Sequence, residues 1–497
     1  MLSIMVFLPL AVAVGLLAVP RAGDTVVRWV WVGACAVEVG LVALVWARYE
    51  PGPNGFAFEA ERRWIPSVDS GYHVGVDGVS LPLVAMTTVL FLACAVYSLR
   101  DTDRVRAYAA LFLSLETVCL GLFVALDLIL FFVFFDLSIV LMYFVISGWG
   151  HRGGPRAALT FFLYTFLGSL ALLLGFLGLY VASDPHTFDL VRLAEQNPLA
   201  DRPAFGALVL LALVLGLAVK TPVVPVHTWL PPAHTEAPSA GSAILAGVLL
   251  KLGTYGFVRI AMPVLPGAWR DYAPVIVAVG VVSVLYGALV ALGQRDFKRM
   301  IAYTSVNHMG YVVLAVGAAG LLASGQAQAR TLAVTGAVTQ MVAHGLITGS
   351  LFLLSGVLYA RGRTYSLDAY GGLAARAPRF AGLTALAAFA SLGLPGFAGF
   401  IAEFQIVTGS LVAVPVAAVL AVLGILLTAA LFLRAYQRVF LGPPRPFDGG
   451  TLRDLTAVEA ASVVPLLALA VAIGLFPRVL LDVIEPAARA LGPVLSR

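Results

Sequence analysis

Apolar segments of about 20 residues recur along the whole chain, and short polar stretches separate them. This is the length that an α-helix needs to cross the hydrocarbon core of a bilayer, and a helix satisfies its backbone hydrogen bonds without water. The pattern therefore predicts an all-α, polytopic membrane protein with about 14 spans. The predicted spans cover residues 3–19, 27–47, 79–98, 108–126, 128–148, 158–181, 205–227, 239–260, 272–293, 300–323, 330–358, 379–406, 411–438 and 457–477.

The composition agrees with a membrane protein. Of the 497 residues, 61% are hydrophobic and only 11% are charged, whereas a soluble chain of this length would carry far more charge. No Ser/Gly-rich linker or low-complexity tract divides the sequence, so we expect residues 1–497 to form a single membrane domain. No basic residue precedes the first apolar segment, which therefore reads as a first transmembrane helix and not as a cleaved signal.

The placement of basic residues predicts the orientation. They gather in the loops that follow odd-numbered spans, whereas the opposite loops are mixed or acidic. Because cytoplasmic loops are enriched in Lys and Arg, these basic loops are expected in the cytoplasm and both termini outside. The basic loops carry Arg21, Arg28, Arg100, Arg104, Arg106, Arg152, Arg156, Arg295, Lys298, Arg299, Arg361, Arg363, Arg376, Arg379, Arg434, Arg438, Arg445 and Arg453.

Proline and glycine interrupt spans 7 and 12. Proline removes an intrahelical hydrogen bond and breaks the helix. Freed backbone groups at membrane depth are tolerated only inside protein or beside water, and paired broken helices in two halves are typical of transporters built from repeats. We therefore expect both spans to be discontinuous. The interrupting residues are Pro222, Pro225, Pro231 and Pro232 in span 7, and Gly393, Pro395, Gly396 and Gly399 in span 12.

A spacing in the sequence favours two repeated units. Lys251 follows Lys220 by 31 positions, and Arg434 follows Glu403 by the same 31 positions. This matches one unit of spans 4–8 and one of spans 9–13, each ending in a broken helix and then a cationic one, although residue identities do not align the units and coincidence stays open. The expected parts are helices 1–3 in residues 1–98, the first unit in 108–260, the second unit in 272–438, and helix 14 with the C-terminus in 457–497.

Lysine is rare, and two lysines lie inside apolar segments. Only three of the 31 basic residues are lysines, namely Lys220, Lys251 and Lys298. Arginine stays charged at any accessible pH, whereas a buried lysine can lose its proton. Lys220 and Lys251, in predicted spans 7 and 8, are therefore candidate sites for gaining and releasing protons.

A carboxylate lies near the middle of span 5. Asp136 is costly there unless it is paired or hydrated, and Lys220 or Lys251 is its natural partner. If such a pair opened and closed, the proton affinity of the lysine would change. The alternative is a static salt bridge that only fixes helix packing.

Four further polar residues fall inside predicted spans. His308 and His344 titrate near neutral pH and lie between Lys251 and Glu403 in chain order, which favours a proton relay; the alternative is hydrogen-bonded core histidines. Glu116 reads as a second partner or a relay acid. The complete candidate set is Glu116, Asp136, Lys220, Lys251, His308, His344 and Glu403.

No redox or metal motif accompanies these residues. His227, His234 and Glu236 lack a compact ligand spacing, and prolines interrupt them, so no metal is expected. The sequence contains no P-loop, dinucleotide fingerprint, haem motif or cluster-binding cysteine set. Its three cysteines read as small apolar helix residues. They are Cys35, Cys94 and Cys119.

Long blocks of this sequence resemble the antiporter-like membrane subunits of proton-pumping NADH:quinone oxidoreductase, respiratory complex I. The resemblance covers nearly the whole chain. Glu403 and the lack of a long lateral helix after the last span resemble the M type of these subunits. The blocks are WIPSVDSGYHVGVDGVSLPLV, KTPVVPVHTWLPPAHTEAPSAGSAILAGVLLKLGTYGFVR, KRMIAYTSVNHMGYV and QMVAHGLITGSLFLLSGVLY.

The resemblance implies 14 helices with two inverted five-helix units and a polar axis through the membrane centre. It implies that Asp136 pairs with Lys220 and that Lys251 is the central lysine. His308 and His344 would then link Lys251 to Glu403, the terminal proton-exchanging acid. The family generally has Glu where this chain has Asp136, so this shorter carboxylate is expected to make a weaker or water-bridged pair.

The resemblance also implies a function and partners. The chain would translocate protons in a bacterial plasma membrane as a subunit of an NADH:quinone oxidoreductase, beside neighbouring antiporter-like chains and peripheral subunits. It would hold no cofactor, because FMN, iron–sulfur clusters and quinone would lie in other subunits. One alternative is a subunit of a multisubunit sodium/proton antiporter, and another is a structural membrane subunit.

Overall fold

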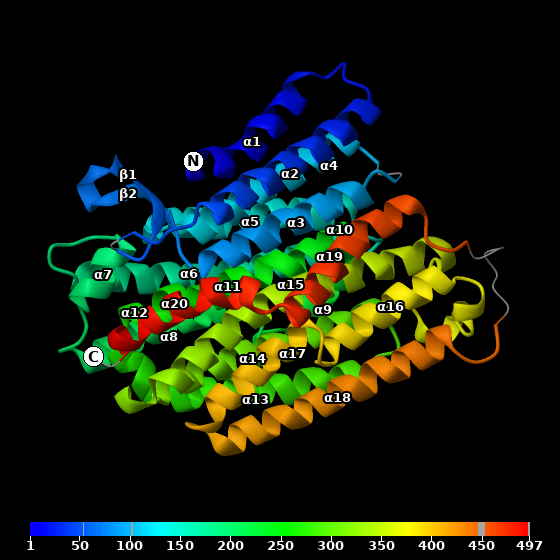
Figure 1. The fold of residues 1–497 in the computed structure, drawn as a ribbon. Helices are drawn as coiled ribbons and strands as arrows, with labels where there is room; N and C mark the ends of the chain where they lie inside the picture. Colours follow the sequence, from blue (N-terminus) through cyan, green and yellow to red (C-terminus); the bar gives the residue numbers. More distant parts are fainter. Residues whose placement is uncertain (53, 101–102, 446–452, 496–497) are drawn as a thin grey trace.

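Long helices run side by side in one bundle in the computed structural model (Figure 1). The structure describes residues 1–52, 54–100, 103–445 and 453–495. The longer helices are α1 (Leu2–Ala18), α2 (Asp24–Ala47), α3 (Ser80–Tyr97), α4 (Val105–Val124), α5 (Leu128–Trp149), α6 (Gly154–Ala182), α8 (Pro203–Lys220), α13 (Pro266–Leu292), α14 (Phe297–Leu321), α15 (Ala327–Gly362), α16 (Pro378–Ser391), α17 (Ala398–Leu411), α18 (Pro415–Phe440), α19 (Ala457–Leu475) and α20 (Arg478–Leu495). The shorter ones are α7 (Leu190–Gln196), α9 (Leu230–Glu236), α10 (Ser239–Ile244), α11 (Leu250–Gly256) and α12 (Met262–Val264).

The predicted all-α membrane fold is confirmed. Every predicted span coincides with helix, and eleven helices in the described ranges are long and apolar enough to cross a membrane. The apolar helices α1 and α17 are shorter, and α14 is not among the eleven. The count of about 14 spans therefore remains a prediction.

Both expected helix breaks are present. α8 ends at Lys220 and the next helix, α9, begins at Leu230. α16 ends at Ser391 and α17 begins at Ala398. Between α16 and α17, Gly393 and Gly396 adopt positive φ angles of 69° and 98°, which glycine tolerates because it has no Cβ. The prolines and glycines of these two segments thus end the helices inside the bundle.

Segment Ser239–Val264, which contains α10 to α12, is helical throughout but irregular. It includes two π-helical stretches, Leu245–Leu249 and Phe257–Ala261. A π-helical turn shifts the backbone hydrogen bonds by one residue and is frequent at functional sites. Lys251 lies between the two stretches, in α11.

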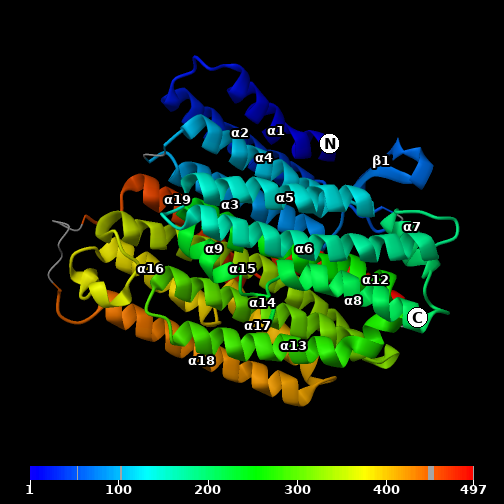
Figure 2. The same cartoon turned by 180° about the vertical axis from the view of Figure 1, so that it is seen from behind.

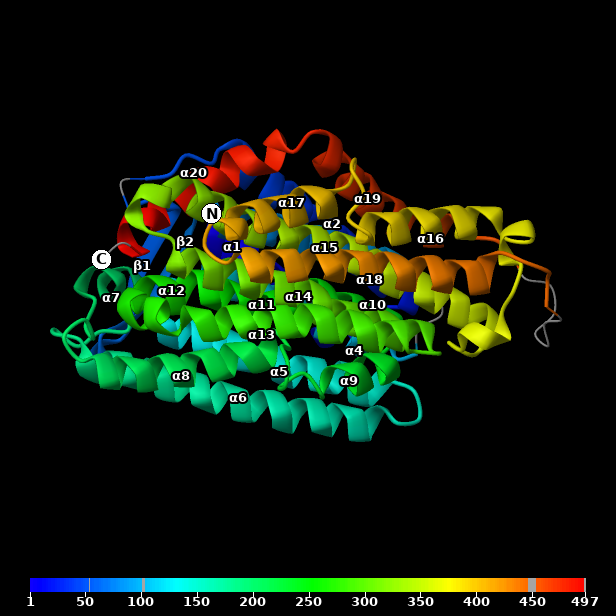
Figure 3. The ribbon, with the colours of Figure 1, turned by 90° about the horizontal axis from the view of Figure 1, so that it is seen from below.

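The centre of the bundle consists of helices that are buried on all sides. The most hydrophobic windows of Ser239–Val264 and Ala327–Gly362 are entirely buried, whereas only a third of that in Pro415–Phe440 is. A helix covered on every side by protein is expected to be hydrophobic all round. Figure 2 shows these central helices behind α5, α6 and α8, and Figure 3 shows α6 and α18 at the outside.

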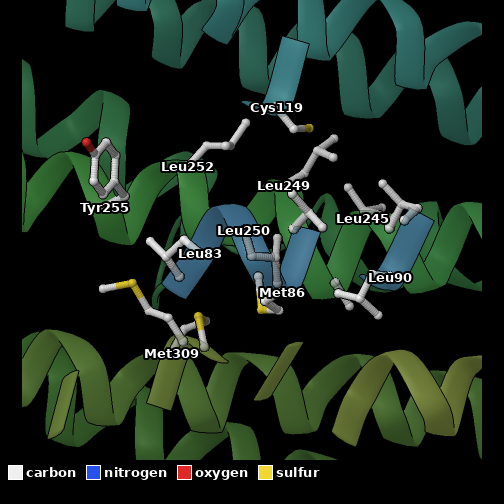
Figure 4. Packing of buried hydrophobic residues seen from close by; sticks show 14 of the residues in the cluster. Leu83, Met86, Leu90, Cys119, Leu245, Leu249, Leu250, Leu252, Tyr255 and Met309 are labelled. Carbon is white, nitrogen blue, oxygen red and sulfur yellow. The ribbon is translucent and has the colours of Figure 1, made fainter. Parts of the chain in front are cut away.

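Side chains of α3 fill the space beside Ser239–Val264. Figure 4 shows side chains of α3, namely Leu83, Met86 and Leu90, packed beside Leu245 and Leu249. On α15, glycine allows the backbone to approach this segment closely, because a Cβ on Gly345 would lie 3.0 Å from the carbonyl oxygen of Gly247. This approach brings α15 beside Lys251.

The hairpin and the last helix were not predicted. Residues Ala57–Ile65 and Ser70–Val76 form an antiparallel hairpin, β1 and β2, where the sequence analysis expected only a loop. The last described segment is helix α20, which packs against α15 and buries Leu480, Ile484, Ala488 and Leu495 (Figures 1 and 3). The apolar residues of α20 lie on one side of the helix only, so a search for spans by mean hydropathy does not detect it.

Candidate functional site

Lys251 begins a buried row of polar side chains. It is fully buried, and its Nζ donates a hydrogen bond to the carbonyl oxygen of Ala246 at 2.6 Å. Ala246 belongs to the first π-helical stretch, where the shifted hydrogen bonding makes a carbonyl available. The same Nζ lies 2.6 Å from Nδ1 of His344 on α15. The lysine therefore has two neutral hydrogen-bonding partners, and no carboxylate of the described residues forms an ion pair with it.

The row continues from α15 to α17. The rings of His344 and His308 are 5.3 Å apart between centroids, and Nε2 of His308 lies 4.0 Å from Oε1 of Glu403. A cavity of about 10 Å³ lies among these three side chains, which is room for about one water molecule. The structure thus brings together four of the predicted site residues, in the order Lys251, His344, His308, Glu403.

Glu403 faces the break between α16 and α17. It is buried, and its Oε2 has no hydrogen-bond partner among the described residues but lies against Gly393. Helical side chains tilt toward the N-terminus of their helix, so this carboxylate, on the sixth residue of α17, lies over the first turn. The N-terminal end of a helix carries a partial positive charge that favours an anion there.

Lys220 lies at the other helix break, as the last residue of α8. It is buried, its Nζ donates to Oγ of Ser138 at 2.8 Å, and the same atom lies 4.8 Å from the centroid of the Phe135 ring. The C-terminal end of a helix carries a partial negative charge that favours a cation. A helix end, a hydroxyl group and an aromatic face therefore surround this lysine.

The expected pair between Asp136 and Lys220 is not formed as an ion pair. No ion pair in the described ranges includes Asp136, whose Oδ1 is buried without a partner. Asp136 and Ser138 are about 200° apart around α5, so the face that meets Lys220 presents the serine. Asp136 instead lies beside Ser169 of α6, within electrostatic range of Lys220.

The helices that carry the two lysines, α8 and α11, meet in a close contact. Gly253 of α11 faces the end of α8, and a Cβ there would lie 2.7 Å from the carbonyl oxygen of Leu217. The hydroxyl group of Thr221 lies in this contact, fully buried and without a hydrogen-bond partner among the described residues. The contact between α8 and α11 therefore joins the Lys220 region to the row.

Glu116 lies outside the row. It is fully buried on α4, and its Oε2 accepts a hydrogen bond from Sγ of Cys35 on α2 at 3.3 Å. The structure therefore brings together four of the seven predicted residues in one row, places Lys220 and Asp136 beside that row, and sets Glu116 apart on the side of α2.

Two buried basic side chains were missed. Lys298 was read as a loop cation, but it is fully buried and donates to the carbonyl oxygen of Ala237 at 2.5 Å. His234 is fully buried and stacks on Phe352 with ring centroids 4.5 Å apart, and no described residue makes a hydrogen bond to either of its ring nitrogens. The rarity of lysine was the one signal that singled out Lys298.

The residues considered for a metal do not converge. His227 packs edge-on against Tyr286, and Glu236 accepts a hydrogen bond from the backbone N–H of Gly153 at 2.9 Å. Across the part of the chain that the structure describes, no group of three or more His, Cys, Asp or Glu side chains has an arrangement that could hold a metal ion.

A separate charged cluster lies outside the membrane spans, on the hairpin. His73 of β2 lies 2.6 Å from Asp189 and 2.8 Å from Glu59, beside a polar cavity of about 650 Å³. Burial alone would lower the pKa of His73, but the hydrogen bonds to both carboxylates outweigh it and raise this pKa. Burial would likewise raise the pKa of Asp189, and the hydrogen bond to His73 lowers it instead. His73 therefore ties the hairpin to the start of α7.

Comparison with known proteins places this geometry in a family. Residues 125–428 match the model of the transmembrane NADH:quinone oxidoreductase/Mrp antiporter family. The chain is 39% identical to NADH-quinone oxidoreductase subunit M of Rhodobacter capsulatus, over 98% of this chain and 95% of that protein. The chain belongs to this family. The subunit M of Rickettsia prowazekii, another member, is also 39% identical, over 88% of this chain and 86% of its own.

Solved structures of the family have the same fold. Respiratory complex I from Thermus thermophilus contains a chain that is 30% identical, with a TM-score of 0.89 and full coverage of both chains. A chain of the Mrp complex from Dietzia is 23% identical, with a TM-score of 0.86 over 100% of this chain and 99% of its own. The Mrp likeness supports the fold alone, whereas the relatives at 39% identity confirm the predicted resemblance to subunit M.

Proposed function

We propose that this chain is the M-type, proton-translocating membrane subunit of an NADH:quinone oxidoreductase. The observation that carries the proposal is the buried row from Lys251 through His344 and His308 to Glu403. Each member can bind and release a proton, and each lies beside the next. A packing role alone does not require three kinds of titratable side chain in consecutive contact.

In the proposed mechanism, Lys251 passes a proton to Nδ1 of His344. A neutral imidazole accepts a proton at one nitrogen and donates from the other, so the two histidines relay it toward Glu403. The 4.0 Å between His308 and Glu403 is too long for a direct hydrogen bond. The last transfer therefore uses a water molecule in the small cavity beside them.

Lys220 and Asp136 set the charge that Lys251 experiences. With its proton, Lys220 is a cation at the contact between α8 and α11 and disfavours a second cation on Lys251. Because Lys220 donates to a serine hydroxyl group, loss of its proton breaks no direct ion pair. Asp136 biases Lys220 toward the charged form, and Glu116 acts as a further relay acid.

The proposed arrangement has two inverted five-helix units, residues 108–260 and 272–438, between an N-terminal part, 1–98, and a C-terminal part, 457–497. Each unit contains one broken helix. Both termini face the outside of a bacterial plasma membrane, because the basic loops then face the cytoplasm.

Electron transfer from NADH to quinone takes place in other subunits of the proposed complex. Those subunits hold the FMN and iron–sulfur clusters and bind the quinone, and this chain is a translocase subunit without a redox centre. Its partners are the neighbouring antiporter-like chains and the peripheral subunits, and its charges couple proton movement to their chemistry.

A sodium/proton antiporter subunit is the second candidate function, because a chain of an Mrp complex has the same fold. The higher identity to the subunit M relatives favours the first candidate. Purification in mild detergent, mass spectrometry of the partners and an NADH:quinone assay separate the two. Flavin and iron–sulfur partners with NADH-dependent quinone reduction support the proposal, whereas small membrane partners without redox activity overturn it.

The variant Lys220→Arg tests the structural alternative. Arginine keeps the positive charge but does not release a proton. We expect a folded complex that has lost most of its proton pumping. Parent-level pumping in Lys220→Arg would assign Lys220 to helix packing.

A further inference from the structure

One face of α2 carries an acid that the proposed mechanism does not use. Trp31, Cys35 and Glu38 follow a spacing of i, i+4 and i+7, which places them on one side of a helix. All three are fully buried, although much of α2 is exposed at the surface of the bundle. Cys35 donates to Glu116, so this face of α2 meets α4.

The carboxyl groups in this contact lack cationic partners. Neither oxygen of Glu38 has a hydrogen-bond partner among the described residues, and Oε1 of Glu116 has none either. The remaining oxygen, Oε2 of Glu116, accepts only from the thiol of Cys35. Two acids therefore share one buried contact between α2 and α4.

The groups that face the two acids are weakly polar or aromatic. Cys35 on α2 and Cys94 on α3 interact with Glu116. Toward one end, the ring of Trp31 packs against Tyr108 and Phe112 of α4, with centroid distances of 5.8 and 5.4 Å. This cluster closes the contact on that side, and no lysine or arginine of the described residues forms an ion pair with either acid.

The same contact leads toward Lys220. Cys119 lies three residues after Glu116, one turn along the same face of α4. It interacts electrostatically with both Glu116 and Lys220. Glu38, Glu116, Cys119 and Lys220 thus form a sequence of neighbours that runs from α2 to the end of α8.

The cost of burying ionised carboxylates limits the charge of the acid pair. Moving an ionised carboxylate into an apolar interior costs several kcal/mol unless a cation or several hydrogen bonds compensate for it. Two carboxylates at one such place also repel each other, so both cannot be ionised together. At least one of the two carboxyl groups must carry a proton.

We propose that Glu38 and Glu116 form a second proton-holding site, which exchanges protons with Lys220 from the side of α2. Both acids precede residue 125, where the match to the family model begins. The exchange with Lys220 rests on the proposed function, whereas the shared proton does not.

Infrared spectroscopy of the intact complex tests the shared proton. Compared with the parent, Glu38→Gln is expected to lose intensity in the C=O band of protonated carboxyl groups at neutral pH, and Glu38→Asp to retain such a band at a shifted position. Glu50→Gln is the matched control, because Glu50 is exposed whereas Glu38 is buried. Loss of carboxylate absorption alone in both Glu38→Gln and Glu116→Gln would overturn the proposal.

Proton pumping tests the exchange with Lys220. Glu38→Gln is expected to lower NADH-driven pumping by roughly tenfold, less than the hundredfold or more that the loss of a central transfer group causes, and Glu38→Asp to restore it. Parent-level pumping in Glu38→Gln, in a preparation where Lys251→Met abolishes pumping, would overturn the exchange. Parent-level pumping in Lys251→Met would contradict the proposed function instead and leave the infrared result to decide on the acid pair.

Discussion

Charged side chains near the ends of the bundle are paired with opposite charges, whereas the interior lysines Lys220 and Lys251 are not. At one end, Arg361 holds Glu459 through two contacts of 2.6 and 2.7 Å, and on the hairpin His73 lies between two carboxylates. In the interior, Lys220 contacts a serine hydroxyl group and Lys251 a backbone carbonyl. The same side-chain chemistry is therefore used in two ways in one chain.

The difference shows which groups can change their protonation state. Removing a proton from a tightly paired cation leaves a buried anion without compensation, which costs several kcal/mol. Lys220 and Lys251 contact neutral acceptors, so they can lose a proton without that penalty. The paired charges fix the structure, and the unpaired ones are free to titrate.

The largest effect on proton pumping is expected from replacing Lys251. Lys251→Met keeps an unbranched side chain but cannot carry a proton, and we expect NADH-driven pumping to fall by about a hundredfold. Acidification measured in reconstituted vesicles provides the readout. The exposed Arg295→Gln is the control and should pump like the parent; comparable pumping in both variants would remove Lys251 from the pathway.

Asp136 tests whether an acid must act through a direct ion pair. It lies within electrostatic range of Lys220 without contacting it, so we expect Asp136→Asn to lose most proton pumping, roughly tenfold for each 1.4 kcal/mol of lost interaction. Asp136→Glu restores the charge and reaches one methylene further. Near-normal pumping by Asp136→Asn would mean that this carboxylate has no role.

The sequence predicted the spans, both helix breaks and the buried lysines because each depends on local chemistry. The prolines and glycines clustered in spans 7 and 12 act on their own backbone, and the length of an apolar segment indicates a span. The partner of Lys220 could not be predicted in this way. Whether Asp136 or Ser138 meets Lys220 depends on how α5 is rotated against α8, and tertiary packing sets that rotation.

The burial of Lys298 and of Glu38 could not be predicted from the sequence either. Lys298 follows a polar stretch and reads as a topology signal, yet the fold covers it completely. Glu38 escaped notice because a single acid in an apolar helix has no periodicity of its own. In both cases the side chain is buried by elements that are distant in the sequence and meet only in the folded chain.

Ser138→Ala is expected to have a smaller effect, and it tests whether the partner of Lys220 sets the pH dependence of pumping. It removes the hydroxyl group that accepts from Lys220, and hydrogen bonds to charged groups contribute about 1.5–3 kcal/mol. We expect the charged form of Lys220 to be disfavoured and pumping to reach its half-maximal rate at a lower pH. Ser410→Ala, at a buried serine on α17 without a hydrogen-bond partner for its hydroxyl group among the described residues, is the control; identical pH profiles for both variants would contradict the role of Ser138.

The smallest expected effect comes from the protonation of His73, which changes only the local stability of the hairpin. Because the pKa of His73 is raised in the folded state, its contribution is present below the unfolded pKa of about 6.5 and is lost as pH rises through the higher folded value. The lowered pKa of Asp189 matters only as pH falls below about 4. Amide hydrogen exchange of β1 and β2, corrected for the intrinsic effect of pH, should therefore show easier opening as pH rises above about 6.5.

In His73→Gln this pH dependence should disappear, with a loss of about 1–3 kcal/mol in opening free energy at pH 6. Proton pumping should stay at the parent level. An unchanged pH dependence of opening in His73→Gln would show that another group controls the hairpin.

Glu403 offers the most direct test of the central claim, because it ends the row and faces a helix break. The measurement is the number of protons pumped per NADH oxidised in vesicles that contain the complex with Glu403→Gln, with Glu50→Gln as the control. The buried row predicts that Glu403→Gln falls to the background of the assay while the control equals the parent. Equal pumping by Glu403→Gln and the parent would show that protons do not travel along this row.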